Sequence, residues 1–409
     1  MGEYFILKTN FFRLSNIKNI FKDSMLSIIA LVLMNLVLQF AVYPFWNRVY
    51  GNEIYGKIVY IMSFVNIFGV AVGSAVNYAR MAESGKRHSN GSEYLTVAFA
   101  GGLFGLFITF LVSFYGKAQM DICSSILGGM LCFFTVLRFY ADIEFRLNIN
   151  YRGYFVYYLL VSIGYIAGVV IVRFIGIWPL ALIFGEIFGL LYVKIKGKSL
   201  SDKLFCHGEY IKENLGAMLL LILTNLISNL IFNGDRLLLM NIAGAGAVTT
   251  YYIASLVGKT MTLITTPLNS VFIGYLIRYK GVFSAKIIKG LFVISSLAII
   301  IFSLLSIPGS YLIVYLLYRN ELENVSRYFA IAGLSQVIYF VSNVVTTVLL
   351  RFAKVDYQLV INIAYGIIFF ALCIPITYFY GINGFCIAIL LVNISRYLLS
   401  IYLCYRSAK

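Results

Sequence analysis

The sequence is poor in charge, in histidine and in proline. Only 12% of its 409 residues are charged, and it contains 2 histidines and 5 prolines. Soluble domains are about 25% charged, so a soluble enzyme or soluble binding domain is excluded as the main class. The two histidines, His88 and His207, lie in polar segments, and the six cysteines show no CxxC spacing. We therefore expect no metal site and no cofactor.

Acidic side chains are scarce as well, with 16 Asp and Glu against 32 Lys and Arg. No carboxylate pair and no Ser/His/Asp set stands out as a catalytic centre. Two GK[ST] sequences, at 197–199 and 258–260, resemble the end of a nucleotide-binding loop. That loop needs a glycine five residues before its last glycine, and these positions hold Tyr192 and Ile253. We expect a protein that is not an enzyme.

Apolar residues are present in large excess. They make up 61% of the chain, and the mean hydropathy is +0.90. A membrane-spanning helix needs about 20 mostly apolar residues. The opening segment lacks the apolar region and cleavage site of a signal peptide. The chain contains twelve candidate spans at 24–45, 56–79, 94–115, 122–145, 153–174, 176–194, 213–234, 247–275, 285–307, 327–350, 356–379 and 382–405.

The Lys and Arg residues alternate from one side of these spans to the other. With the N-terminus in the cytoplasm, 22 of the 32 fall on the cytoplasmic side, 7 on the outer side and 3 inside spans. This bias fits the positive-inside rule and predicts a multi-pass membrane protein with both termini cytoplasmic. It also accounts for the net charge of +16 without a nucleic-acid partner.

Short matches indicate an internal repeat. Gly176 and Gly381 follow aromatic residues and precede a span, while Gly51 and Gly244 each join the first two spans of a half. An even number of spans per copy makes the repeat parallel. The predicted fold is an all-α polytopic membrane protein of twelve helices, in two parallel-repeat six-helix bundles around a central cavity. The predicted lobes are 1–198, with helices 1–6, and 199–409, with helices 7–12.

Polar residues form stripes on the same two helices of each half. Residues spaced by three or four positions share one helix face. The stripes are Asn35, Gln39, Tyr43 and Asn47 in helix 1, Asn66, Gly69, Gly73 and Asn77 in helix 2, Asn225, Asn229, Asn233 and Arg236 in helix 7, and Ser255, Lys259, Thr262, Thr266 and Ser270 in helix 8. Amides facing lipid are costly, so the stripes either line a hydrated cavity or bond neighbouring helices to one another.

Several charged residues are expected deep in the membrane, where charge is costly and usually functional. Lys259 lies near the middle of helix 8, and Arg396 near the middle of helix 12, where it serves either function or packing within the second bundle. Arg138 and Asp142 are spaced i, i+4 and are expected to pair locally. Glu186 in helix 6 has no obvious local partner.

The chain resembles the Wzx-type O-antigen and polysaccharide flippases, of the polysaccharide transporter family in the multidrug/oligosaccharidyl-lipid/polysaccharide exporter superfamily. The resemblance extends over nearly the whole chain in length, span count and span order. It rests on "RVYGNEIYGKIVYIMSF" (48–64), "NGDRLLLMNIAGAGAVTTYYIASLVGK" (233–259) and "YGINGFCIAI" (380–389).

This resemblance implies a central cavity lined by helices 1, 2, 7 and 8. It also implies transfer of an undecaprenyl-diphosphate-linked oligosaccharide between the leaflets of the bacterial inner (cytoplasmic) membrane, for O-antigen (lipopolysaccharide) or capsule synthesis. Membrane lipids, a polysaccharide polymerase and chain-length proteins are further candidate partners. Cationic side chains suit a diphosphate, and amides suit sugar hydroxyls. The candidate substrate-binding residues are Lys259, Arg80, Arg48, Asn225, Asn229, Asn233, Asn35, Gln39 and Asn77. The candidate gating residues are Asp235 and Arg236.

Two other functions compete with a flippase working by alternating access. A multidrug/cation antiporter of the same superfamily would need an acidic cavity, whereas the deep groups here are mostly basic. A membrane-embedded glycan polymerase or acyltransferase would need a catalytic His or carboxylate on an outer loop, and the longest such loop, about 308–326, offers no persuasive set.

Overall fold

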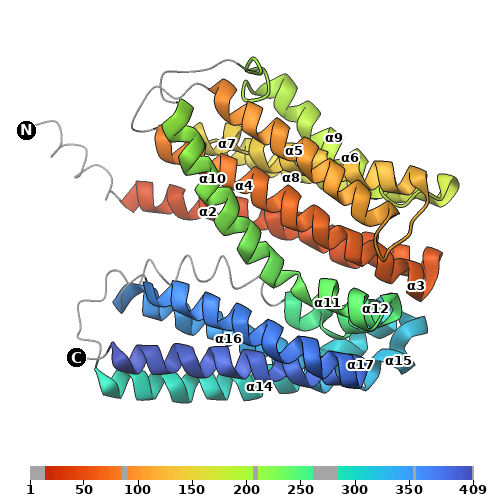
Figure 1. Ribbon diagram of the computed structural model, residues 1–409. Helices are drawn as coiled ribbons and strands as arrows, with labels where there is room; N and C mark the ends of the chain where they lie inside the picture. The colour runs from red at the N-terminus through yellow and green to blue at the C-terminus, as the bar shows by residue number, and fades with distance from the viewer. Residues whose placement is uncertain (1–13, 85–90, 206–210, 261–283, 353–355, 408–409) are drawn as a thin grey trace, which may run out of the picture. The chain divides into compact units, whose positions relative to one another are not determined.

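The computed structural model describes residues 14–84, 91–205, 211–260, 284–352 and 356–407, and within these ranges the chain is helical with short connections (Figure 1). The helices before residue 200 are α2 (Leu14–Val37), α3 (Tyr43–Phe64), α4 (Ala71–Ser84), α5 (Gly91–Phe114), α6 (Ile122–Ala141), α7 (Ile143–Leu147), α8 (Tyr151–Ile175) and α9 (Leu180–Lys196). Two π-helical turns, η1 (Leu38–Val42) and η2 (Val65–Val70), join α2 to α3 and α3 to α4.

The second half of the chain continues in the same way. Its helices are α10 (Ile211–Phe232), α11 (Gly234–Ile242), α12 (Ala245–Ala254), α14 (Ala285–Leu317), the 3₁₀ turn η3 (Arg319–Glu321), α15 (Leu322–Ser326), α16 (Phe329–Phe352) and α17 (Asp356–Arg406). Helical residues continue from 256 to 260 beyond α12. The described residues include eight helical segments long and apolar enough to cross a membrane, so the chain is a multi-pass membrane protein.

All twelve predicted spans coincide with helix in the described part of the chain, and the all-α prediction is confirmed. Two of the eight long segments, Met25–Ser84 and Tyr357–Arg406, are 60 and 50 residues long and each contain two predicted spans. A left-handed glycine breaks each segment, Gly51 in the first and Gly381 in the second. The predicted eighth span is described only up to residue 260, so Pro267, Thr262, Thr266 and Ser270 lie outside the described residues.

The backbone supports one of the two repeat matches more strongly than the other. Gly51 has φ 76° and ψ 176°, and Gly244 has φ 84° and ψ 177°. This extended conformation at positive φ is essentially restricted to glycine, and the two copies share it at the equivalent turn. Gly176 and Gly381 both have positive φ, but their ψ values are 13° and −143°. The turn between the first two helices of each half is therefore the better conserved feature of the repeat.

The chain packs as two compact units. Unit 1 comprises residues 1–49 and 61–233, and unit 2 comprises residues 50–60 and 234–409. The units do not coincide with the two halves of the sequence. Residues 50–60 of the first half belong to unit 2, and α10 of the second half belongs to unit 1. The lobes at 1–198 and 199–409 stay a prediction based on the repeat.

Small residues hold the helices of unit 1 close together. A Cβ on Gly164 would lie 2.5 Å from the Cα of Gly185, and one on Gly168 would lie 2.5 Å from the carbonyl oxygen of Ala181. Such close approach of backbones is how membrane helices gain van der Waals contact where no hydrophobic force drives their association. The α8–α9 pair is therefore fixed by glycine at matched positions.

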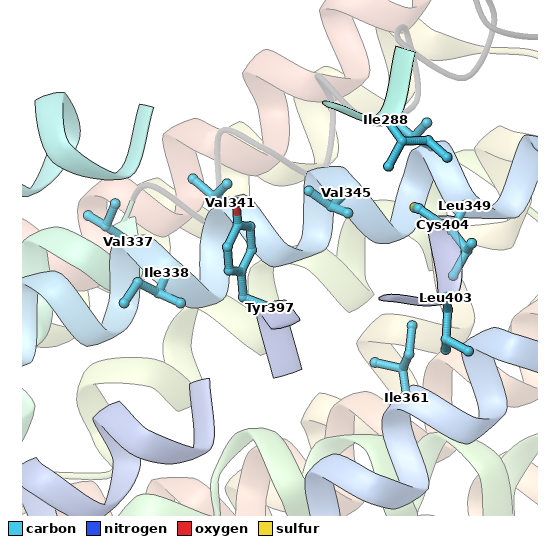
Figure 2. Packing of buried hydrophobic residues seen from close by; sticks show 11 residues of the cluster. Ile288, Val337, Ile338, Val341, Val345, Leu349, Ile361, Tyr397, Leu403 and Cys404 are labelled. Atoms are coloured by element: carbon cyan, nitrogen blue, oxygen red, sulfur yellow. The ribbon is translucent and has the colours of Figure 1, made fainter. Parts of the chain in front are cut away.

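Unit 2 has its core on α14, α16 and α17 (Figure 2). Val337, Val341 and Val345 follow one face of α16, and Tyr397 of α17 packs beside them. The Tyr397 hydroxyl lies 2.7 Å from the hydroxyl oxygen of Ser295 on α14. This tyrosine therefore ties three helices together within an otherwise apolar core.

Large apolar side chains also cover much of the outer surface. Phe174 is 83% exposed, Leu304 is 65% exposed and Tyr378 is 74% exposed. A soluble protein would not leave this many large apolar side chains in water, whereas lipid tails solvate them. Aromatic residues gather just before Gly381, as is typical of a helix end at the membrane interface.

Candidate functional site

The site begins with a buried ion pair that the fold makes between two distant residues. Asp235, near the start of α11, is 6% exposed, and the ammonium group of Lys259 donates a hydrogen bond to its Oδ2. The Lys259 side chain is 14% exposed. Because α11 and α12 fold back on each other at Gly244, two residues 24 apart in sequence come into contact. Lys259 thus has a direct carboxylate partner, which the sequence did not reveal.

Two tyrosines complete the environment of this pair. The Lys259 Nζ lies 5.6 Å from the ring centre of Tyr251 and 6.0 Å from that of Tyr252. The guanidinium carbon of Arg236 lies 4.9 Å from the Tyr252 ring. Ring faces carry partial negative charge, so they stabilise cations in a poorly hydrated place. We call Asp235, Arg236, Tyr251, Tyr252 and Lys259 the Lys259 cluster.

The Lys259 cluster is buried inside unit 2. Arg236 is 7% exposed and, like Asp235, was predicted to gate the outer rim of a cavity. The structure instead places both side chains against α12 and its extension, with the Asp235 Oδ1 accepting a hydrogen bond from the Arg236 backbone N–H at 2.9 Å. Their role as a gate stays a prediction. Asp235 is the ion-pair partner of Lys259, and Arg236 is a second cation beside the same carboxylate.

The asparagine stripe of α10 bonds along its own helix. Asn229 donates its side-chain N–H to the carbonyl oxygen of Asn225, and Asn233 donates to that of Asn229, both at 2.9 Å. The Asn225 amide reaches the carbonyl oxygen of Ala71 in α4 at 3.5 Å. An amide group can form up to four hydrogen bonds, and these contacts use only its nitrogen. Asn225 and Asn229 are half-buried, whereas Asn233 is buried.

The stripes of the first two helices divide into two kinds. Asn35 and Gln39 are half-buried, and Asn35 donates to the carbonyl oxygen of Leu31 at 2.9 Å. Gln39 lies in η1 and Asn66 in η2, the two π-helical turns. Single π-helical turns within α-helices are frequent at functional sites. Asn35 and Gln39 therefore keep their place among the candidate substrate contacts.

Asn77 has a different environment, which agrees with the helix-bonding alternative. It is 2% exposed, and its Nδ2 donates to Asp142 Oδ1 at 2.5 Å and to the Phe139 carbonyl oxygen at 3.0 Å. Asp142 also forms an ion pair with Arg146 at 3.1 Å and accepts a hydrogen bond from the Tyr158 hydroxyl at 3.0 Å. Asn77 thus joins α4 to the α6–α8 region, and we leave it out of the proposed substrate contacts.

The prediction that Arg138 pairs with Asp142 is wrong. The Arg138 Nε instead lies 2.5 Å from the Glu186 Oε2, and the Tyr165 hydroxyl donates to Glu186 Oε1 at 2.9 Å. Both charged side chains of this pair are nearly inaccessible, at 4% and 2% exposure. Glu186 therefore has its partner on α6, which the spacing along one helix could not indicate.

The two remaining candidate cations lie at helix ends. Arg80 at the end of α4 forms an ion pair with Asp202 at 3.3 Å and donates a hydrogen bond to the Tyr140 hydroxyl. Arg48, just before the Gly51 turn, is exposed. In unit 1 two segments predicted to be cytoplasmic also bond to one another, because the Ser92 hydroxyl donates to the carbonyl oxygen of Lys203. This grouping agrees with the predicted alternation of the spans.

The "YG" part of the sequence motif is a packing device within unit 2. Tyr55 is fully buried, and its hydroxyl lies 3.3 Å from that of Tyr318. A Cβ on Gly56 would lie 2.0 Å from the carbonyl oxygen of Ala245, so only glycine fits there. The Asn52 amide donates to Glu321 at 2.6 Å. These residues bind the part of α3 that follows Gly51 to α12 and to the η3 region.

Comparisons with solved structures place this architecture among transporters. An inward-facing MATE-family multidrug resistance transporter of the MOP superfamily has a TM-score of 0.65 at 12% identity, covering 93% of this chain and 94% of that one. The inward-closed lipid II flippase MurJ also has a TM-score of 0.65, at 14% identity, with coverage of 93% and 85%. An outward-facing MATE-family transporter has 0.62 at 14%, covering 94% of each chain.

No protein-family model matches the chain, and no curated protein matches it in sequence. The likeness is therefore one of fold. The chain has the twelve-helix fold of MOP-superfamily transporters, a fold shared by multidrug transporters and a flippase for a lipid-linked substrate.

Proposed function

We propose that the chain is a flippase that moves a polyprenyl-diphosphate-linked oligosaccharide across the cytoplasmic membrane, for synthesis of a surface polysaccharide such as O-antigen or capsule. One observation carries the proposal: a largely buried lysine, Lys259, stands in unit 2 against a carboxylate and two tyrosine rings. A diphosphate is a stronger acceptor of charge-assisted hydrogen bonds than most groups a transporter meets. We assign Lys259 as the residue that binds the diphosphate.

When the substrate binds, the diphosphate replaces Asp235 as the partner of Lys259. In the structure the ammonium group of Lys259 donates a hydrogen bond to Asp235. A diphosphate carries more negative charge than one carboxylate, so it competes with Asp235 for the lysine. Asn225, Asn229, Asn35 and Gln39 are the proposed contacts to sugar hydroxyls, and the lipid tail remains in the bilayer.

The proposed transport cycle is alternating access. Transporters with this fold are described in inward-facing and outward-facing conformations, and one of them is a flippase for lipid II, a lipid-linked substrate. We extend this cycle to the present chain, with the N- and C-termini on the cytoplasmic side as the Lys and Arg distribution predicts.

A glycan-export assay tests the role of Lys259. In a strain lacking the gene, Lys259→Ala should lower export about tenfold or more, since charge-assisted hydrogen bonds contribute about 1.5–3 kcal/mol. Lys259→Arg should keep part of the activity, and Lys289→Ala, at an exposed lysine of the same unit, should leave it unchanged. In the Lys259→Ala strain the lipid-linked saccharide should accumulate on the cytoplasmic leaflet. Full export by the Lys259→Ala variant would refute the assignment.

Asp235 favours a second candidate, the multidrug/cation antiporter. A buried carboxylate flanked by tyrosines is a feature that would hold an organic cation if Lys259 moved away. Resistance of overexpressing cells to cationic drugs separates the two functions. The flippase predicts no change in resistance, whereas the antiporter predicts resistance that Asp235→Asn abolishes.

A further inference from the structure

Arg396 occupies an unusual place in unit 2. It lies midway along the last stretch of α17 and is 7% exposed. Its guanidinium carbon is 4.4 Å from the ring centre of Tyr339 on α16 and 5.2 Å from that of Tyr365 on α17. The two rings are 5.8 Å apart and tilted by 48°. The arginine is therefore enclosed by two aromatic faces.

No acidic side chain among the described residues neutralises this charge. The Nε and Nη1 atoms of Arg396 are buried and have no hydrogen-bond acceptor there. Arg138 of unit 1, which is buried to a similar degree, has the Glu186 carboxylate at 2.5 Å. Tyrosine rings attract a cation, but they do not accept hydrogen bonds in the plane of a guanidinium. Within the described residues Arg396 thus has aromatic rings beside it, while its Nε and Nη1 donors have no acceptor.

The enclosure of Arg396 reaches the surface of unit 2, and the helix that carries Tyr339 also contacts the Lys259 cluster. Tyr339 and Tyr365 are half-buried, so the enclosure reaches the surface of the unit. One turn earlier on α16, Gln336 donates a hydrogen bond to the Tyr251 hydroxyl at 3.1 Å. Tyr251 is the residue whose ring faces Lys259. Helix α16 therefore carries one contact to each buried cation's surroundings, Tyr339 to Arg396 and Gln336 to Tyr251 of the Lys259 cluster.

We propose that Arg396, with Tyr339 and Tyr365, forms a second anion site in unit 2 that takes a phosphate or carboxylate group of the transported substrate. The planar guanidinium binds two oxygens of such a group at once. This proposal rests on the proposed function, because it assigns a second acidic group of the same substrate. That group is either the other phosphate of the diphosphate or the carboxylate of an acidic sugar.

Thermal unfolding of the purified protein in detergent micelles tests this assignment. The probes are inorganic pyrophosphate and glucuronate, each titrated at constant ionic strength. Arg396→Met should raise the Tm without ligand, because a buried charge that lacks a partner is costly. It should also raise the anion concentration at half-maximal stabilisation by about tenfold or more. Arg319→Met, which removes an exposed arginine 5.3 Å from a tyrosine ring of the same unit, should change neither.

The variants and probes also distinguish the source of the anion. A pyrophosphate response weakened by both Arg396→Met and Lys259→Met points to the diphosphate. A glucuronate response weakened by Arg396→Met alone points to an acidic sugar. Arg396→Lys keeps the charge but loses the planar fork, so it should fold like the wild type and still bind either anion more weakly.

One pattern would overturn the proposal. If Arg396→Met lowers the Tm without ligand while neither anion response changes in Arg396→Met or Arg396→Lys, the arginine serves only packing against the tyrosines. The proposed function then still stands or falls on the export assay with Lys259, because that assay does not involve Arg396.

Discussion

Asp235→Asn removes the negative charge that faces Lys259 while keeping the size of the side chain. At a normal ion-pair separation of about 3 Å and an effective dielectric constant of about 20, the attraction between the two charges is about 5 kcal/mol. Removing one partner of a buried pair costs about 3–5 kcal/mol, because the other charge stays buried. We expect Asp235→Asn to lie at the lower end, about 3 kcal/mol, since the asparagine oxygen still accepts a hydrogen bond.

The surroundings of the pair make the two single substitutions unequal. The Asp235 carboxylate also interacts electrostatically with Arg236. Asp235→Asn therefore leaves two cations together, whereas Lys259→Met leaves Asp235 with Arg236. We expect Lys259→Met to cost about 1–2 kcal/mol, less than the loss of the carboxylate. Residues in direct contact are typically coupled by about 0.5–3 kcal/mol, and we expect about 2 kcal/mol here.

The assay is denaturant unfolding of the purified protein in micelles, applied to the two single variants and the double variant. Lys289→Met, at an exposed position of the same unit, serves as the matched control and should change the free energy of unfolding by less than about 0.5 kcal/mol. A Lys259→Met variant less stable than Asp235→Asn would refute this account of the cluster. Additive effects of the two substitutions would refute the ion pair itself.

The remaining predictions concern the backbone turn and the charge pairs of unit 1. Gly244→Ala should destabilise the protein by about 1–3 kcal/mol, because φ is 84° there and a side chain is strained in that conformation. Gly290→Ala, in a helix with open space around it, should be neutral or stabilising in the same unfolding assay. Glu186→Gln should cost about 3–5 kcal/mol by leaving Arg138 buried without its carboxylate. Asp202→Asn, at a half-exposed ion pair, should cost less than about 1 kcal/mol, and equal losses in the two variants would contradict this ranking.

The membrane-spanning helices were predictable because a segment's ability to cross the bilayer depends on its own composition. A run of about 20 apolar residues must form a helix in lipid, since the backbone groups have no other partner there. The turn glycines were predictable from the internal repeat. Gly51 and Gly244 occupy matching places in the sequence, and both adopt the same positive-φ conformation.

The partners of the deep charges were not predictable in the same way. Spacing along one helix suggested Arg138 with Asp142, yet Arg138 pairs with Glu186, 48 residues away on another helix. Asn77 carried the stripe pattern of a cavity residue, yet its amide bonds to Asp142 and to backbone carbonyl groups. Which helix faces which depends on tertiary packing, and a periodic pattern of polar residues does not encode it.

The distribution of charge within each unit supports placing both proposed anion sites in unit 2. In unit 1 three arginines at or near helix contacts each have an acidic partner: Arg138 with Glu186, Arg146 with Asp142 and Arg80 with Asp202. In unit 2 the described residues include three buried or largely buried cations, namely Lys259, Arg236 and Arg396. Lys259 forms an ion pair with Asp235, and Arg236 lies near the same carboxylate. A protein interior keeps an excess of one charge only at a cost. A substrate that carries several negative charges offsets this cost when it binds, and such a substrate is what a diphosphate-linked saccharide provides.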